Sequence, residues 1–228
     1  MTEYIFTSDE MMAADQLAIK NGISSRSLMH SAGEAVLKNL PLDHNGIVLI
    51  ICGPGNNGGD GYVVAGLLSS LGVTVDVVSL EFGKNPSKDH QVYKKKLDQL
   101  IFKKKPSDLS NYEYVVDALF GIGLSRNLSD EINDLINDIN SANLDVYSID
   151  VPTGIHSDTG EVHGTAFKSQ KPVTFFNKKL CHYLLPGRQY CGEIVVEDIG
   201  ISHTVINKIM PKLKQNEPSL WIDQFHIH

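Results

Sequence analysis

The chain has 228 residues, of which 42% are hydrophobic and 21% charged, a balance that is ordinary for a globular protein. Its net charge of −7 argues against a nucleic-acid-binding surface, which is basic, and no apolar run is long enough to cross a membrane. The N-terminus lacks a signal-peptide pattern, and three cysteines without metal-ligand spacing suit a reducing compartment. We therefore expect one cytoplasmic domain over residues 1–228, with its core at about residues 9–203 and a polar C-terminal tail.

Two helices are predicted near the N-terminus. Residues 7–10 offer N-cap candidates followed by acidic residues, and the helix that begins there ends near Asn21 and Gly22. A second helix covers about residues 25–40 and carries an apolar stripe. Both helices are interpreted as packing against the core or against another subunit.

A strand, a glycine-rich turn and a helix follow. Residues 47–52 form a continuous apolar run, which is typical of a strand buried on both faces. Residues 53–61 contain the turn, and apolar residues at helical spacing come after it. This arrangement directs backbone N–H groups and a helix N-terminus toward an anion. We expect glycine here because it tolerates positive φ and leaves room for a ligand.

The turn allows more than one interpretation. Its spacing G-x-G-x-x-G matches the dinucleotide fingerprint, but Asp76 lies inside the next predicted strand and Glu81 stands at its end. A tight connection without any ligand is the simplest alternative. Such a turn does not need Asn56, Asn57 and Asp60, which supply oxygen ligands and hydrogen bonds to hydroxyl groups.

Strands and helices alternate through the rest of the chain. The predicted strands are residues 73–80, 112–119, 144–149, 172–176 and 193–197, and the predicted helices are residues 87–100 and 128–140. Alternation of this kind indicates a three-layer α/β/α sandwich, Rossmann-like, with a mostly parallel sheet whose closing strands can run in either direction. Lysine runs at 94–96 and 103–105 are interpreted as solvated surface.

Two carboxylates stand where predicted strands end. Asp117 interrupts an apolar strand, and a buried carboxylate is costly unless it is paired or bound to a metal. Asp150 ends another strand, where Pro152 and Gly154 turn the backbone; an Asx-turn is the simpler role for it. Ligands of open parallel sheets bind outside the carboxyl ends of the strands, so Asp60, Asp117 and Asp150 are expected at one edge.

Four motifs together resemble the YjeF N-terminal family, the NAD(P)H-hydrate epimerases. They are residues 55–61 (GNNGGDG), residues 116–124, residues 149–155 with 158–160, and residues 185–187 with 198–200. The resemblance implies a substrate of hydrated NADH or NADPH, with a hydroxyl group on C6 of the reduced nicotinamide ring. It also implies interconversion of the R and S epimers, so that a companion dehydratase that acts on the S form can restore the cofactor.

The resemblance also assigns roles to individual positions. It places Asp150 at the reacting ring as the catalytic residue, and it implies a potassium ion held by Asn57, Asp117 and Thr153. The implied substrate-binding residues are Asn56, Asn57, Gly58, Gly59, Asp60, Gly121, Ile122, Gly123, Leu124, Ser125, Arg126, Asn127 and Asp150.

Three positions depart from the family's usual residues: His30 replaces an acidic residue, Ile122 replaces a threonine, and Thr153 replaces a serine while keeping the hydroxyl group. The chain is too short to include the dehydratase, so the resemblance implies a separate dehydratase partner; it also makes a homodimer the expected assembly.

Our mechanistic hypothesis gives Asp150 both proton transfers. It would protonate the C6 hydroxyl group as water leaves and then accept a proton as water returns on the other face of the ring. Two other functions stay open, namely a non-catalytic nucleotide- or protein-binding module of the same fold and a nicotinamide-dependent oxidoreductase. The first predicts loss of the carboxylates or the asparagine pair, and the second predicts tight binding of intact NAD(H).

Overall fold

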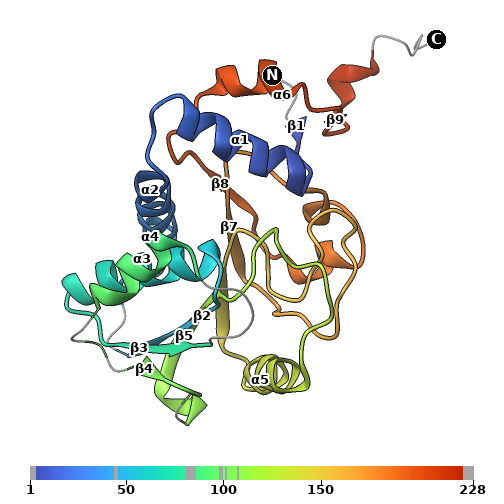
Figure 1. Cartoon of the computed structure of the whole chain (residues 1–228). Helices are drawn as coiled ribbons and strands as arrows, with labels where there is room; N and C mark the ends of the chain where they lie inside the picture. Colours follow the sequence, from blue (N-terminus) through green and yellow to red (C-terminus); the bar gives the residue numbers. More distant parts are fainter. Residues whose placement is uncertain are drawn as a thin grey trace.

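The computed structural model describes residues 4–43, 46–80, 86–97, 100, 102–106 and 108–222 (Figure 1). In this part of the chain, seven strands form one sheet in the order β4-β3-β2-β5-β6-β7-β8. Every neighbouring pair is parallel, so the closing strands β7 and β8 run in the same direction as the others. The strands are β2 (Ile47–Cys52), β3 (Val75–Ser79), β4 (Phe102–Lys103), β5 (Tyr112–Ala118), β6 (Asp145–Ile149), β7 (Lys171–Phe175) and β8 (Val195–Glu197).

Helices cover both faces of the sheet, which confirms the three-layer α/β/α architecture (Figure 1). On β2, Val48 and Ile50 pack with the helices α2 and α3, whereas Leu49 and Ile51 pack with α5 on the opposite face. This alternation is the two-residue period of a strand buried on both sides. The helices are α1 (Ser8–Lys20), α2 (Ser25–Lys38), α3 (Asn56–Ser70), α4 (Lys88–Lys95), α5 (Asp130–Ser141) and α6 (Ile206–Ile209).

The predicted start of α1 is confirmed in detail. The Thr7 side chain accepts a hydrogen bond from the Glu10 backbone N–H, and the Glu10 side chain accepts one from the Thr7 N–H at 2.8 Å. This capping box satisfies two N–H groups at the start of the helix. The segment before α1 is held as well, because the Phe6 N–H donates to the Lys178 carbonyl oxygen at 2.9 Å.

The two ends of the described chain meet in a second, two-stranded sheet. Strand β1 (Tyr4–Ile5) pairs antiparallel with β9 (Leu213–Lys214), so both lie at the top of Figure 1. Tyr183 also donates to the Gln215 side chain at 2.7 Å. The polar segment that we expected to be a tail is therefore in contact with the domain over at least these residues.

The direction of chain progression reverses between β2 and β5. From β2 the chain moves outward to β3 and β4, and it then returns to β5 on the other side of β2. Cys52 pairs with Ala118 in this parallel register, so the loops that leave the carboxyl ends of β2 and β5 are adjacent. A reversal of this kind opens a crevice outside the strand ends, where ligands of α/β sheets bind.

The glycines of the turn serve close backbone packing, and one of our two expectations for them is wrong. None of the glycines in residues 53–61 has a positive φ. A Cβ atom on Gly58 would lie 1.8 Å from the Gly53 carbonyl oxygen, so the turn requires the absence of a side chain there. Gly55 is different, because nothing lies within 4 Å of its Cβ position.

Candidate active site

A fully buried carboxylate lies at the base of the crevice. Asp117, on β5, is 0% exposed, and its Oδ2 accepts hydrogen bonds from the Ser148 hydroxyl at 2.9 Å and the Thr153 N–H at 2.8 Å. Its Oδ1 accepts from the Thr153 hydroxyl at 2.6 Å and the Leu119 N–H at 3.3 Å. Burial raises the pKa of the Asp117 carboxyl to about 6, although these four hydrogen bonds act in the opposite direction.

The groups that donate hydrogen bonds to Asp117 are all neutral, so none of them balances its negative charge. The Thr153 hydroxyl also accepts from the Phe120 N–H at 3.0 Å, and the Phe120 carbonyl oxygen lies 3.3 Å from it. A carboxylate, a hydroxyl and a carbonyl oxygen therefore stand together, which is a donor set for a hard cation of low charge. Among the described residues, no group of three His, Cys, Asp or Glu side chains has the geometry of a metal site.

A second carboxylate is paired with a buried lysine. Asp150 follows β6 with a φ of 69°, a left-handed conformation that is strained for a residue other than glycine. Its Oδ1 accepts hydrogen bonds from the Thr174 hydroxyl at 2.8 Å and from the Lys179 ammonium at 2.6 Å. Lys179 is itself only 1% exposed, and it also donates to the Phe175 carbonyl oxygen at 3.1 Å.

The charge of Lys179 decides the ionisation of Asp150. Burial by itself would raise the pKa of the Asp150 carboxyl. The Lys179 ammonium, together with the hydrogen bonds from Lys179 and Thr174, outweighs burial and lowers that pKa below its usual value. Asp150 therefore stands as a carboxylate at neutral pH, with one oxygen occupied by protein donors.

The other oxygen of Asp150 faces the glycine-rich turn. A Cβ atom on Gly121 would lie 3.2 Å from Asp150 Oδ2 and 3.3 Å from Asn57 Oδ1. Gly121 thus leaves space between a carboxylate oxygen from β6 and an amide from the start of α3. The Asn57 amide nitrogen is buried and has no hydrogen-bond partner among the described residues, so it is a donor without a protein acceptor.

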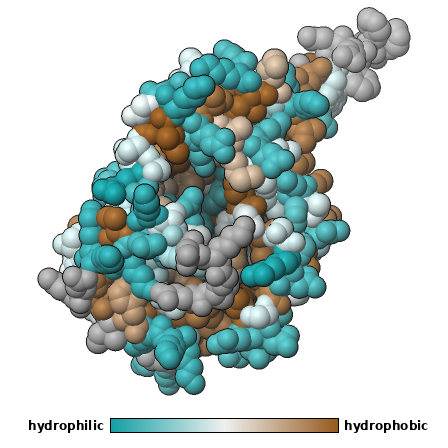
Figure 2. All heavy atoms as spheres, viewed as in Figure 1, coloured by the Kyte–Doolittle hydropathy of each residue, from teal (hydrophilic) through white to brown (hydrophobic). Residues whose placement is uncertain are grey.

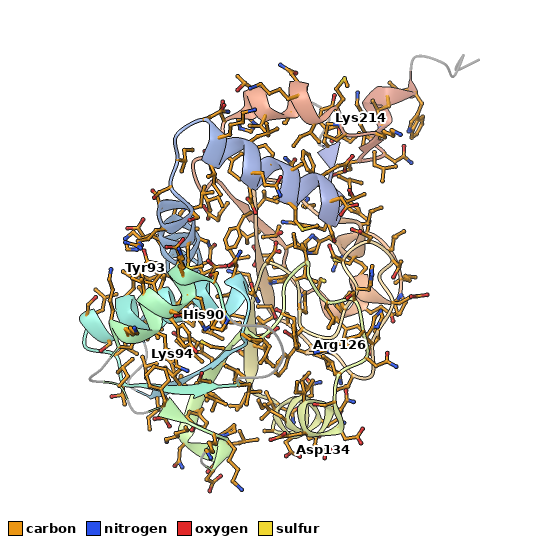
Figure 3. The ribbon with its side chains drawn as sticks, viewed as in Figure 1. His90, Tyr93, Lys94, Arg126, Asp134 and Lys214 are labelled. Atoms are coloured by element: carbon orange, nitrogen blue, oxygen red, sulfur yellow. The ribbon has the colours of Figure 1, made fainter. Side chains whose placement is uncertain are left out.

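The N-terminus of α3 has no side-chain cap. Its N-cap residue is Gly55, which contributes no side-chain hydrogen bond, so the first N–H groups of the helix are open to a ligand. His90, a buried residue of α4, lies with Nδ1 3.0 Å from the Gly55 carbonyl oxygen (Figure 3). This contact joins α4 to the turn.

Two further carboxylates act on the same site. Burial raises the pKa of Asp60 well above its ordinary value, and the charges of Asp150 and Asp15 raise it further. Burial also raises the pKa of Asp15, on α1, to about 6, where Lys179 acts to lower it and Asp150 to raise it. Asp15 and Asp60 are therefore both influenced by the charge of Asp150, and Lys179 acts on Asp15 and Asp150.

The segment that follows β5 is divided between core and surface. Leu124 is 4% exposed and packs with α5, so its side chain belongs to the core. Ser125, Arg126 and Asn127 are exposed, and Figure 3 shows Arg126 among the loops near α5, on which Asp134 is labelled. The Ile122 side chain packs against apolar neighbours, and its carbonyl oxygen is 3.3 Å from the Ser8 hydroxyl.

Several of the other residues named from the sequence have structural roles. Asp76 accepts a hydrogen bond from the Tyr112 hydroxyl at 2.8 Å and pairs with Lys103, so it is not open to a ribose; Glu81 lies outside the described residues. His30 is exposed, 3.6 Å from Glu34. Asp158 accepts from the Ser8 N–H at 2.7 Å and holds the start of α1.

Sequence reasoning missed Asp15, His90 and Lys179. Asp15 was detectable, because it stands one helical turn from Met11 on the face of α1 that carries buried residues. His90 and Lys179 had no comparable signal. Their roles depend on contacts with residues 35 and 29 positions away, namely Gly55 and Asp150.

The fold and the site together define a Rossmann-like α/β protein with a polar crevice at the reversal of its sheet. A family described as "YjeF-related protein N-terminus" matches residues 25–181. The NAD(P)H-hydrate epimerase of Limosilactobacillus reuteri is 39% identical over 209 residues, which cover 88% of this chain and 98% of that protein. The chain belongs to the family of YjeF-related N-terminal domains.

Two further relatives bear on organisation and fold. The bifunctional NAD(P)H-hydrate repair enzyme Nnr of Thermofilum pendens is 33% identical over 222 residues, which cover 89% of this chain but 41% of that protein. The crystal structure of the yeast protein YNL200c superposes with a TM-score of 0.77 at 21% identity, over 93% of this chain and 96% of that one. This likeness confirms the fold.

Proposed function

We propose that the chain is an NAD(P)H-hydrate epimerase, an isomerase that interconverts the R and S forms of hydrated NADH and NADPH. One observation carries the proposal: Asp150 presents a single open carboxylate oxygen beside Asn57, across the space left by Gly121. A binding module has no need of a strained, lysine-paired carboxylate at this edge of the sheet. The activities after which the Limosilactobacillus and Thermofilum relatives are named support the same function.

The substrate would lie across the crevice between the loops that follow β2 and β5. The uncapped N-terminus of α3 suits the pyrophosphate, because its N–H groups and helix dipole favour negative charge. The proposed binding residues are Asn56 to Asp60 and the segment from Gly121 to Asn127, together with Asp150. Leu124 would act through the backbone, since its side chain is in the core.

Asp150 would carry out acid–base chemistry at C6. The C6 hydroxyl group departs as water, which produces a cation that the ring nitrogen stabilises. Addition of water to the other face then gives the epimer. Both steps move a proton, and a positioned carboxyl group typically contributes about 10²–10⁴-fold to such transfers. The ionised carboxylate is also placed to stabilise the cationic ring.

Asn57, Asp117 and Thr153 would hold a potassium ion. All three supply oxygen, and the buried Asp117 charge meets only neutral donors in the structure, so one monovalent cation would balance it. Bound there, the ion would supply positive charge next to the substrate site. Thr153 keeps the hydroxyl group that the serine of other family members provides.

We propose that residues 1–228 form one epimerase domain. A separate NAD(P)H-hydrate dehydratase would then act on its product. The bifunctional name of the Thermofilum relative, of which this chain covers 41%, fits such a division. We propose that the protein is cytoplasmic, which its three free cysteines suit, and that it forms a homodimer, which the family resemblance implies. Among the described residues, no helix has both the length and the apolar character needed to span a membrane.

Epimerisation of purified R-NADHX tests the proposal. The enzyme is added to the R epimer in potassium buffer, and chromatography that separates the epimers follows the approach to an R/S mixture. We expect acceleration well above the buffer rate, and faster turnover in potassium than in sodium at equal ionic strength. No acceleration in either buffer would contradict the proposal and favour a binding module.

A further inference from the structure

Epimerisation at one carbon requires two proton transfers on opposite faces of the ring; this requirement rests on the proposed function. One transfer gives a proton to the leaving hydroxyl group, and the other removes a proton from the entering water. Asp150 offers one open oxygen, because Lys179 and Thr174 occupy the other. A single fixed oxygen is poorly placed to serve both faces, so the site needs a second acid–base group.

Asp15 lies on the inward face of α1. Met11, Ala14 and Ala18 are the buried residues of this helix, and Asp15 is four residues after Met11 on the same face. Helix formation does not require a carboxylate beside these buried residues. In the described part of the chain, Asp15 forms no hydrogen bond or ion pair with another side chain, so the charge of Lys179 acts on it only through space.

Three contacts hold α1 over the crevice. The Phe6 N–H donates to Lys178, next to Lys179, at 2.9 Å. The Ser8 hydroxyl lies 3.3 Å from the Ile122 carbonyl oxygen, in the proposed substrate loop, and the Ser8 N–H donates to Asp158. Figure 2 shows this face of the molecule hollowed below α1, so the helix forms one rim of the site.

The charged groups that face Asp15 come from three other elements. They are Lys179 and Asp150, near the ends of β7 and β6, and Asp60 on α3. Lys179 is committed to Asp150 by a direct hydrogen bond, so its charge only partly offsets the effect of burial on Asp15. Asp15 and Asp60 therefore hold protons more tightly than exposed carboxyls do, and burial raises the pKa of Asp15 to about 6, close to neutral pH.

We propose that Asp15 is a second acid–base residue of this site and gives a proton to the leaving C6 hydroxyl group, while Asp150 takes one from the entering water. In this step the C6–O bond breaks as the ring nitrogen donates its electron pair, and water departs. A second water molecule then forms the new C6–O bond on the other face and loses its proton to Asp150. In the reverse direction the two carboxyl groups exchange roles.

The test compares Asp15→Asn with Asp9→Asn. Asp9 is an exposed residue in the first turn of the same helix, so the control makes the same chemical change away from the crevice. We expect kcat/KM for R-NADHX, corrected for the buffer rate, to fall about 10²-fold or more in Asp15→Asn and to stay unchanged in Asp9→Asn. In the wild type, kcat/KM should decline above about pH 6, and this decline should be absent in Asp15→Asn.

A second variant separates catalysis from structure. Asp15→Ala should regain activity in proportion to added formate, because the small acid can occupy the space of the missing carboxyl group. A lower rate with an unchanged pH profile and no formate rescue would overturn the proposal, as would full activity of Asp15→Asn. An inactive wild type would overturn the epimerase function itself, which distinguishes the two failures.

Discussion

The Lys179 ammonium lies 2.6 Å from Asp150 Oδ1, and the two side chains are only 1% and 12% exposed. The pair therefore contributes to the stability of the fold as well as to the candidate active site. Removal of one partner from a buried ion pair leaves an uncompensated charge and typically costs about 3–5 kcal/mol, whereas removal of both costs far less. This relationship determines how the proposed catalytic residue has to be tested.

Asp150→Asn should lose stability as well as activity. We expect a decrease of about 3 kcal/mol in the free energy of unfolding, measured with urea, because Lys179 stays buried without its counter-ion. The double variant Asp150→Asn/Lys179→Met should recover most of that stability and none of the activity, which should remain at least about 10²-fold below wild type. Recovery of activity in the double variant would rule out Asp150 as the acid–base group.

Asp15→Asn should stabilise the protein at high pH and not at low pH. Burial raises the pKa of Asp15 from 3.8 to about 6, so the folded state binds more protons than the unfolded chain between those values. Stability from this group therefore falls as pH rises from about 4 to 6 and stays reduced above that. Thermal melts at pH 8 should show a gain on the order of 1–2 kcal/mol, with little change at pH 3.5. A stability loss at pH 8 would contradict the assigned direction of the shift.

Potassium should stabilise the protein through Thr153. We expect a higher melting temperature in potassium chloride than in sodium or choline chloride at equal ionic strength, because a bound cation favours the folded state. Thr153→Val removes the hydroxyl that joins Asp117 to the Phe120 N–H and should abolish the potassium-specific increase. Thr153→Ser keeps the hydroxyl group and should preserve the potassium-specific increase in melting temperature. Equal melting temperatures in the three salts would argue against an ion site here.

The two glycines Gly58 and Gly55 should respond differently to alanine. Gly58→Ala places a Cβ 1.8 Å from the Gly53 carbonyl oxygen, so we expect a loss of about 3 kcal/mol or more, or failure to fold. Gly55→Ala meets nothing within 4 Å and should keep its melting temperature within a few degrees. Its Cβ would instead stand where the substrate approaches α3, so KM should rise. An unchanged KM would show that the ligand does not approach Gly55.

Local sequence patterns were sufficient for the elements and their order. The continuous apolar run of β2, the N-cap signal at the start of α1 and the apolar stripe of α2 are local features, and the structure has all three. The strand-end rule also placed Asp117 and Asp150 at one edge, since parallel strands share the side on which they end. The helix predicted over residues 87–100 is shorter, with α4 at Lys88–Lys95.

The sequence by itself determined the fold class through its periodicity and turn chemistry, and the family through its motifs. It also proposed the residues of the site. Only the tertiary structure decided how the acidic groups are charged. Lys179 binds Asp150 across 29 positions, and Asp15 comes over the crevice from the other end of the chain. The proton affinity of a carboxyl group depends on burial and on charges a few ångströms away, and chain topology alone determines which residues supply them.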